Sequence, residues 1–161
     1  MNVKEKRIRW DQLIICILIP LAVGTLSGLI SQNAWMTFEN VQKPPLSPPG
    51  WLFPVVWTVL YILMGIASYL IIQSDAPADR TSPALLIYGI QLFFIFFWSI
   101  LFFNLEWYLF SFFWLLVLWG LILLMMILFY RIHRVSAYLL IPYLLWVTFA
   151  GYLNLGIYLV N

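Results

Sequence analysis

Residues 108–130 read YLFSFFWLLVLWGLILLMMILFY, a stretch of 23 residues without a charged side chain. A helix that crosses roughly 30 Å of hydrocarbon needs about 20 apolar residues. The stretch therefore predicts a membrane-spanning helix. The whole chain has the same character, because 65% of its 161 residues are hydrophobic and only 9% are charged. Its 8 Lys or Arg and 6 Asp or Glu residues are too few to form the polar shell of a soluble domain.

The same criterion finds four further spans, at residues 12–31, 51–72, 83–103 and 136–160. None of the five contains Asp, Glu, Lys, Arg or His. A charge at the centre of a span costs about 2.5–3.5 kcal/mol, so this clean boundary favours spanning helices. Helices also satisfy their own backbone groups in lipid. We predict an all-α fold, in which residues 1–161 form one integral membrane bundle of five transmembrane helices.

The basic residues lie unevenly on the two sides of the predicted bundle. The N-terminal segment and the loops at residues 73–82 and 131–135 hold seven Lys or Arg, whereas the opposite side holds only Lys43. The positive-inside rule places the N-terminus in the cytoplasm and the loop at residues 32–50 outside. The first apolar run is too long for a signal peptide and lacks a small-x-small cleavage site. We therefore expect a multi-pass protein of the cell membrane.

The composition excludes several kinds of chemistry. One Cys and one His cannot supply a Cys/His metal cage or a disulfide framework, and we predict no metal site and no cofactor. The spans carry no Asp, Glu, Lys, Arg or His for a proton relay, and no catalytic triad or carboxylate pair is available. The basic residues do not cluster as in a nucleic-acid-binding protein, so we predict no nucleic-acid partner. The guest that fits best is bulky, largely apolar and aromatic.

One connection differs from the others in length and composition. Residues 32–50 form a link of 19 residues, whereas helices in bundles are usually joined by about 2–8. Four prolines stiffen it and favour an extended course, and Trp35, Phe38 and Trp51 provide apolar anchors. We interpret the link as a semi-rigid lid over one end of the bundle. A rigid spacer or a proline-rich ligand is the alternative.

Other residues predict local features of the helices. Ser47 followed by Pro48 predicts an N-cap for the second helix. Pro20 and Pro142 lie inside spans and predict kinks, because each removes a backbone hydrogen bond. The small residues from Gly24 to Gly28 permit close helix approach or dimerisation.

Two amides and several indoles lie deep in the predicted spans, where lipid offers no partner for their hydrogen-bonding groups. Gln91 and Asn154 point inward on this argument, either to hold the bundle together by interhelical hydrogen bonds or to line a cavity. Trp146 lies roughly 15 Å from either end of its span, so its N–H needs an internal partner. For Trp57 and Trp98, core packing and cavity lining both fit the pattern.

Three blocks of the chain resemble the signature of the tryptophan-rich sensory protein or translocator protein family, also called the peripheral benzodiazepine receptor family. They comprise Val41-Gln42-Lys43-Pro44-Pro45 and Pro48-Pro49-Gly50-Trp51 with Trp57, Leu60-Tyr61 and Met64-Gly65; Gln91-Leu92 with Trp98-Ser99 and Phe102-Phe103; and Pro142-Tyr143 with Trp146, Phe149-Ala150 and Leu153-Asn154. The blocks and the five spans cover essentially the whole chain.

The resemblance implies a five-helix bundle that often dimerises and binds porphyrins such as protoporphyrin IX, with synthetic benzodiazepine-type ligands competing for the same cavity. Light-dependent breakdown of the porphyrin is attributed to some members, and transport of tetrapyrroles or cholesterol to others. By motif, the implied ligand-binding residues are Trp51, Trp98, Trp146, Phe149 and Ala150 in the cavity, Pro44 and Pro45 in its lid, and Tyr61, Gln91 and Asn154 nearby. Trp51 and Trp146 are our candidates for photochemistry, because an indole beside an excited porphyrin can donate an electron or react with activated oxygen.

The chain departs from the family pattern at two places. Members commonly have Asn four residues after the Gln of the third helix, whereas this chain has Ile95, so a polar contact to the ligand is lost. The chain ends at Tyr158-Leu159-Val160-Asn161 without the basic residue of the cholesterol-type motif, which makes cholesterol a poor candidate.

Three functions follow from these observations. We favour a membrane receptor for tetrapyrroles and benzodiazepine-type ligands that promotes light-dependent oxidative degradation of the bound porphyrin; the sequence leaves open whether that turnover is enzymatic. The first alternative is a transmembrane transporter of tetrapyrroles, although no coupling residue is present. The second is a structural or assembly protein whose aromatic residues only pack.

Overall fold

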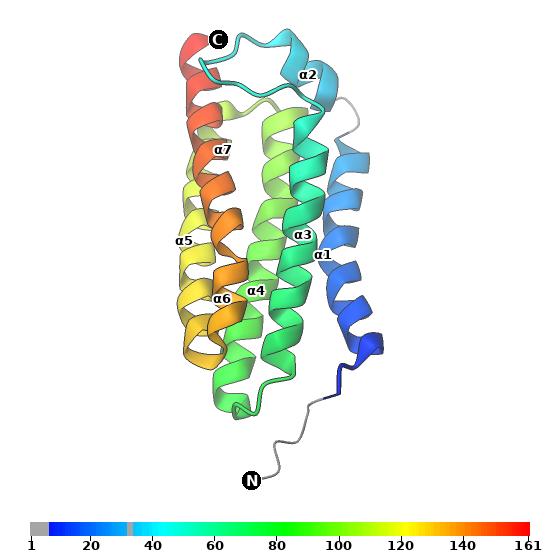
Figure 1. Cartoon of the computed structure of the whole chain (residues 1–161). Helices are drawn as coiled ribbons and strands as arrows, with labels where there is room; N and C mark the ends of the chain where they lie inside the picture. The colour runs from blue at the N-terminus through cyan, green and yellow to red at the C-terminus, as the bar shows by residue number, and fades with distance from the viewer. Residues whose placement is uncertain (1–6, 32–33) are drawn as a thin grey trace.

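The computed structural model describes residues 7–31 and 34–161, which form an upright bundle of helices (Figure 1). The elements are α1 (Trp10–Ile30), α2 (Ala34–Asn40), α3 (Leu52–Ile72), α4 (Ala78–Ser99), the π-helical turn η1 (Ile100–Asn104), α5 (Tyr108–Ile132), α6 (Arg134–Leu139) and α7 (Ile141–Val160). The described part of the chain is thus all-helical, as predicted.

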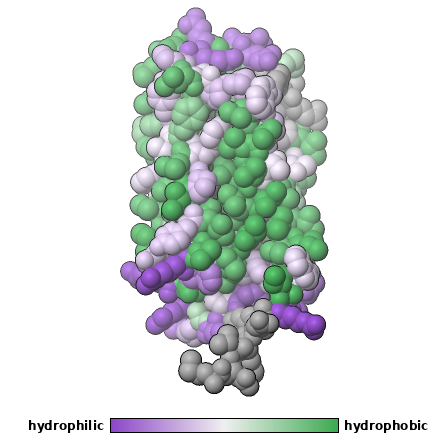
Figure 2. Space-filling view, in the orientation of Figure 1, coloured by the Kyte–Doolittle hydropathy of each residue, from purple (hydrophilic) through white to green (hydrophobic). Residues whose placement is uncertain are grey.

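Five segments are long and apolar enough to cross a membrane: α1, α3, α4 with η1, α5, and α6 with α7. Apolar residues cover the middle of the visible face, while hydrophilic residues gather at its two ends (Figure 2). Large aliphatic side chains such as Leu18, Leu86 and Leu145 are exposed. A soluble protein does not present such a continuous apolar belt. The protein is therefore a multi-pass membrane protein, and the predicted fold class is confirmed.

The two ends of the bundle differ. The start of α1, the α3–α4 connection and the α5–α6 connection lie at one end, which carries Arg9, Arg80, Arg131 and Arg134 and which we call the basic end (Figure 1). The chain between α1 and α3 crosses the opposite end, which we call the lid end. Lys4 and Lys6, two of the seven basic residues that the sequence places at the basic end, lie outside the described residues. The side chain of Trp35 lies outside them as well. The cytoplasmic location of the basic end stays a prediction.

The interior is packed by apolar side chains together with a few polar ones that are paired. Met64, Ile122 and Tyr143 are fully buried. Gln91 and Asn154 are also fully buried, which confirms that both amides point inward. The Tyr143 hydroxyl donates to Gln91 Oε1 over 2.7 Å, so the amide is satisfied between α4 and α7.

Two glycines bring α1 and α3 into close contact. A Cβ added at Gly24 would lie 2.1 Å from Tyr61 Cε2, and one added at Gly65 would lie 2.5 Å from Ile17 Cα. Both distances are far below van der Waals contact, so only glycine fits at these positions. Gly24 thus serves helix packing within the chain, one of the two roles that its small-residue pattern allows.

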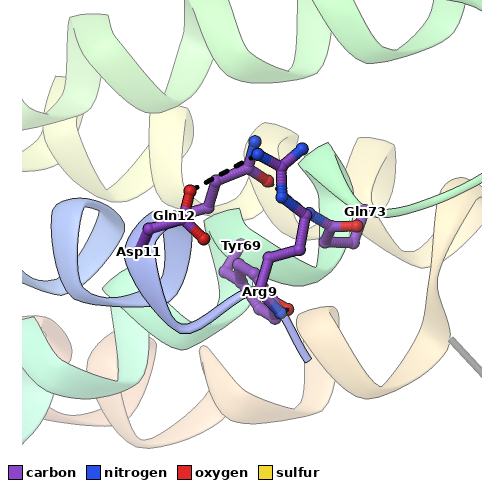
Figure 3. Close-up of polar contacts among 5 residues, drawn as sticks. All are labelled: Arg9, Asp11, Gln12, Tyr69 and Gln73. Atoms are coloured by element: carbon purple, nitrogen blue, oxygen red, sulfur yellow. Dashed lines mark hydrogen bonds and ion pairs between the residues drawn. The ribbon is translucent and has the colours of Figure 1, made fainter. Parts of the chain in front are cut away.

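Polar contacts join the same two helices at the basic end (Figure 3). The Arg9 backbone N–H donates to the Tyr69 hydroxyl oxygen over 3.0 Å. Gln73 Nε2 donates to Gln12 Oε1 in the same cluster. The Arg9 guanidinium also lies 3.4 Å from the Asp11 carboxylate. These contacts hold the start of α1 against the end of α3.

The predicted N-cap of the second helix was wrong. Ser47 Oγ instead donates to the Pro44 carbonyl over 2.8 Å, and α3 begins five residues later, with Trp51 at its N-cap position. The reason lies in Pro48 and Pro49, because a residue that precedes proline is disfavoured in the α conformation. The segment from residue 41 to residue 50 therefore stays non-helical.

The spans themselves also differ from the predicted ranges. α4 begins at Ala78, outside the apolar stretch, since a helix continues beyond the hydrocarbon where its charged residues meet water. The last span breaks at Leu140, and Pro142 lies in the first turn of α7, where its missing N–H has no helical partner to lose. α1, in contrast, runs through Pro20 without interruption.

Candidate functional site

A cavity of about 300 Å³ lies at the lid end, between α1, α3 and α4 and beneath α2. Every residue that lines it is uncharged, and five of them are aromatic: the lining consists of Gly28, Ser31, Phe38, Gly50, Phe53, Pro54, Trp57, Ile95, Trp98, Ser99 and Phe103. A guest here would be held by apolar contact and ring stacking, with few polar groups to orient it.

Local sequence explains why the bundle is hollow at this place. Gly28 and Ser31 are small residues on the last turns of α1, and a Cβ added at Gly28 would meet nothing within 4 Å. On the facing helix, the turn that follows Ser99 widens into η1, which carries Phe102 and Phe103. Such π-helical turns change the direction of side chains and recur at functional sites. Small residues on one wall and a widened turn on the other leave the space open.

Trp98 is fixed in the cavity wall by a buried polar network. Its indole Nε1 donates to Asn154 Oδ1 over 3.1 Å, and Ser111 Oγ donates to the same oxygen over 3.0 Å. Asn154 Nδ2 donates in turn to the Tyr108 carbonyl over 2.7 Å. This network ties α4, α5 and α7 together. Because the Trp98 N–H is satisfied within the protein, the ring offers a guest its π face instead of a hydrogen bond.

Aromatic rings extend the wall around Trp98. The Phe102 ring stacks on it with centroids 5.5 Å apart, and the Trp57 ring lies 6.3 Å away. Tyr61 stacks on the far side of Trp57, at 5.7 Å, and forms a second layer behind the cavity. The indoles of Trp57 and Trp98 are therefore the two that border the cavity directly.

A second, much smaller space adjoins the first and reaches α7. It measures about 10 Å³, and its walls include Ala150, Leu153 and Asn154 of α7 together with Trp98. A space of this size holds at most a single water molecule. Ala150 and Asn154, two residues predicted for the site, thus line the small space but not the main cavity, and the side chains common to both spaces are those of Phe38, Phe53, Trp98 and Phe103.

Trp146 contacts this region through one neighbour. Its ring packs edge-on against Phe53 at 5.8 Å and lies 5.5 Å from Phe149 on its own helix. The Trp146 Nε1 is buried and has no hydrogen-bond partner among residues 7–31 and 34–161. The expectation that this N–H has an internal partner was therefore wrong for the described residues, and an unpaired buried donor of this kind costs about 1–3 kcal/mol.

The remaining predicted site residues lie outside the cavity wall. Trp51 is 58% exposed at the start of α3. Gln91 lies deeper in the bundle, where it accepts a hydrogen bond from Tyr143. Pro44 and Pro45 belong to the lid, but they contact α7 instead of the cavity.

The lid is fastened to α7 by specific contacts. The Tyr152 hydroxyl donates to the Pro45 carbonyl over 2.7 Å. Pro44 packs so closely on Gly156 that an added Cβ there would lie 2.6 Å from Pro44 Cγ. Asn161 Oδ1 accepts from the Gln42 N–H over 3.0 Å. In Figure 1 the chain accordingly runs from α2 across to α7 before it returns to α3.

Sequence reasoning missed part of the lining. Phe53 and Gly28 were not assigned to the site, although Phe53 precedes Trp57 by four residues on the same helix face. Phe38 was recognised as an anchor of the lid, but α2, the helix that carries it, was not predicted. Ile95, identified as a departure from the family pattern, does line the cavity. In the part of the chain that the structure describes, no cluster of His, Cys, Asp or Glu could hold a metal ion.

Comparison with known proteins agrees with this architecture. The TspO/MBR family matches residues 16–159. The tryptophan-rich protein TspO of Chlorobaculum tepidum is 35% identical over 151 residues, which cover 92% of this chain and 95% of that protein. Its counterpart in Archaeoglobus fulgidus is 36% identical, with 93% and 97% covered. The translocator protein of Bos taurus is 29% identical, with 85% and 82% covered. A family match over nearly the whole chain, together with relatives that align along almost their full length, shows that the protein belongs to the TspO/MBR family.

Proposed function

We propose that this protein is a membrane receptor for flat, largely apolar aromatic molecules, with tetrapyrroles such as protoporphyrin IX and benzodiazepine-type compounds as its ligands. The observation that carries the proposal is the uncharged cavity at the lid end, whose wall contains the indoles of Trp57 and Trp98. Stacked and edge-on aromatic contacts with a guest contribute about 0.5–1.5 kcal/mol each beyond the burial of area. Such a wall favours conjugated rings over aliphatic guests.

One cation at the lid end, Lys43, suits an amphipathic ring with an acidic edge, whereas Glu39 and Glu106 at the same end would repel that edge. Lys43 lies there with its Nζ 4.6 Å from the centre of the Phe38 ring. A porphyrin propionate can reach this ammonium while the macrocycle stays among apolar side chains. The ligand would therefore enter with its acidic edge toward the lid.

The size of the cavity indicates that the lid moves when a large guest binds. Ligand pockets usually measure about 300–1,000 Å³, and this cavity, at about 300 Å³, lies at the lower limit. Phe38, Phe53, Trp98 and Phe103 line both the cavity and the small space beside Ala150, and the rings of Phe38 and Phe53 lie 4.9 Å apart. Displacing these two rings joins the two spaces and opens a path to the unpaired Trp146 N–H.

We further propose that the bound porphyrin is degraded oxidatively under light. From the sequence, Trp51 and Trp146 are our candidates for this chemistry. Trp57 and Trp98 border the cavity, whereas Trp51 is exposed to the surroundings. Photolysis of bound protoporphyrin IX, followed by its absorbance, separates these assignments: slower loss in Trp98→Phe than in Trp51→Phe favours the cavity indoles, and the reverse order favours the original assignment.

The two alternatives receive less support. A transporter needs a route across the bundle, but the interior below the cavity is filled by residues such as Met64, Gln91 and Tyr143, which are fully buried. A purely structural role leaves the uncharged cavity without a purpose. Homodimerisation is a proposal taken from the family resemblance, and chemical cross-linking in native membranes would test it.

Titration with protoporphyrin IX tests the receptor function. We expect saturable quenching of tryptophan fluorescence in the detergent-solubilised protein. Trp98→Ala removes a stacking face, which for ring stacking is worth about 1–3 kcal/mol, so the dissociation constant rises at least fivefold. Trp107→Ala is the matched control, because Trp107 is exposed at the same end but lies outside the cavity. Equal affinities of the two variants would contradict the proposal.

A further inference from the structure

A second hollow lies at the basic end, far from the ligand cavity. It is a groove of about 500 Å³ between the first turns of α4 and the last turns of α5, lined by Asp79, Arg80, Pro83, Leu128, Arg131 and Ile132. One part of its wall is charged and the other part is apolar. From this arrangement we infer a binding site for an anionic glycerophospholipid, with the phosphate between Arg80 and Arg131 and an acyl chain along Leu128 and Ile132.

The position of the groove fits a lipid better than a soluble anion. Its arginines come from the ends of α4 and α5, where the apolar belt meets the charged surface. Headgroup phosphates lie at this depth of a bilayer, and the acyl chain continues from there into hydrocarbon. Basic pockets between transmembrane helices bind phospholipid headgroups by this geometry. A free anion would gain nothing from the apolar wall.

The helix dipole favours the position of one of the two arginines but not that of the other. Arg131 lies in the last turn of α5, where a cation is favoured by the helix dipole. Arg80 lies in the first turn of α4, where a cation is disfavoured. Neither guanidinium forms an ion pair with another residue of the described ranges. Asp79 in the same turn forms no ion pair with Arg80 within the described ranges, so a phosphate in the groove would be the partner of the Arg80 guanidinium.

Asp79 restricts the charge that the lipid headgroup can carry. Its carboxylate lines the same groove, and it would repel a second negative charge on the headgroup. A headgroup that carries one phosphodiester charge and a hydrogen-bond donor avoids this repulsion, and the hydroxyl groups of a glycerol headgroup donate to the carboxylate without cancelling the negative charge that the two arginines bind. Phosphatidylglycerol has this chemistry and serves as the probe.

Binding of phosphatidylglycerol to the delipidated full-length protein, measured by native mass spectrometry, tests the site. We expect saturable binding of phosphatidylglycerol and weaker binding of phosphatidylcholine. A basic residue near a lipid phosphate contributes about 1 kcal/mol, so Arg80→Gln and Arg131→Gln each weaken binding about fivefold. Arg134→Gln is the matched control, because Arg134 lies at the same end with its guanidinium carbon 5.5 Å from the Tyr130 ring, outside the groove. Asp79→Ala reduces the preference for phosphatidylglycerol over phosphatidic acid.

Three results would overturn the inference. If Arg134→Gln weakens binding of phosphatidylglycerol as much as the groove variants do, the binding depends only on the overall charge of this end. Equal binding of phosphatidylcholine would remove the role of the headgroup, and full competition by inorganic phosphate would make the groove a site for a free anion. Thermal unfolding of each variant without lipid is measured in parallel, and weaker binding that merely follows a lowered melting temperature also counts against the site.

Discussion

Gly24 and Gly28 are one helical turn apart on α1, yet their surroundings are opposite. A side chain at Gly24 would collide with Tyr61, whereas Gly28 faces open space in the cavity wall. The first glycine is needed for helix packing and the second for the volume of the cavity. One sequence pattern thus contains a structural residue and a candidate site residue.

Substitutions at these two glycines separate folding from binding. A Cβ at Gly28 would meet nothing within 4 Å, and the leucine side chain of Gly28→Leu would extend into the cavity, so we expect protoporphyrin quenching to be lost while the melting temperature stays equal or rises, since glycine in a helix costs about 0.5–1 kcal/mol. Gly24→Ala overpacks the α1–α3 contact and costs about 1–3 kcal/mol. Thermal unfolding and ligand titration of both variants measure the difference. A Gly28→Leu protein that still binds would show that the guest sits elsewhere.

Asn154 is the residue on which the orientation of Trp98 depends. It accepts from Trp98 and Ser111 and donates to the Tyr108 carbonyl, all within the bundle. Asn154→Leu leaves these groups unpaired, at a cost of about 1–3 kcal/mol for each buried group that finds no new partner.

We therefore expect Asn154→Leu to lower the melting temperature more than Ser111→Ala, which removes only one of the three hydrogen bonds. It also shifts the emission of Trp98 and weakens binding of protoporphyrin IX, because the ring is no longer held in the wall. Fluorescence spectra and titrations check both effects. Unchanged affinity in Asn154→Leu would mean that the position of Trp98 does not matter for the guest.

At the scale of elements, the lid is attached to α7 by individual side-chain contacts, which single substitutions can remove. Tyr152 supplies one of its ties to α7, a hydrogen bond to the Pro45 carbonyl, beside the packing of Pro44 on Gly156 and the hydrogen bonds between Gln42 and Asn161. Tyr152→Phe removes that bond, which is worth about 1 kcal/mol, and we expect ligand dissociation to become about fivefold faster. Stopped-flow fluorescence measures the rate. Thr148→Val on the same helix is the control, since its hydroxyl bonds to Trp119 away from the lid. If both variants release the ligand at the wild-type rate, the lid does not control exit.

The spans could be predicted from the sequence because their signal is simple: about 20 apolar residues without a charge are sufficient evidence. The shorter features carry no such signal. α2 spans only seven residues, η1 differs from an α-helix by one hydrogen-bond step, and the break at Leu140 depends on how the chain packs before Pro142. Each of them is decided by tertiary contacts, which a single sequence does not reveal.

The candidate site was predictable to the same limited degree. Trp98, Ala150 and Asn154 come together around one small space. Helical spacing alone gave each of them an inward face, but it could not set the distance between helices. Trp51 shows the limit, because it ends a proline-rich segment whose course depends on contacts with α7, and its ring is exposed. Phe53 was missed because an apolar residue in an apolar helix has no distinguishing pattern.

At the scale of the whole molecule, different helices are joined by hydrogen bonds at the two ends of the bundle. At the basic end, hydrogen bonds between Arg9 and Tyr69 and between Gln12 and Gln73 lock α1 to α3. At the lid end, α1 is tied to α4 instead, through the Ser27 hydroxyl on the Phe96 carbonyl. The cavity opens beside α3, where these ties are missing from the described contacts. Hydrogen bonds between α1 and α3 at the basic end and the aromatic cavity at the lid end make the two ends different and give the bundle a polarity across the membrane.

That polarity predicts a topology that can be measured directly. The basic end faces the cytoplasm if the charge count holds, so the lid end faces outward. The chain has one cysteine, Cys16, which is only 6% exposed and gives little background with a membrane-impermeant maleimide. Leu46→Cys places a thiol on the lid at a position 85% exposed, and Val135→Cys places one at the basic end at a position 52% exposed. In intact cells we expect the first variant to be labelled and the second only after permeabilisation, with the unaltered protein unlabelled in both cases. The opposite pattern would invert the protein in the membrane, and it would then move the ligand cavity to the cytoplasmic side, so that guests would enter from inside the cell.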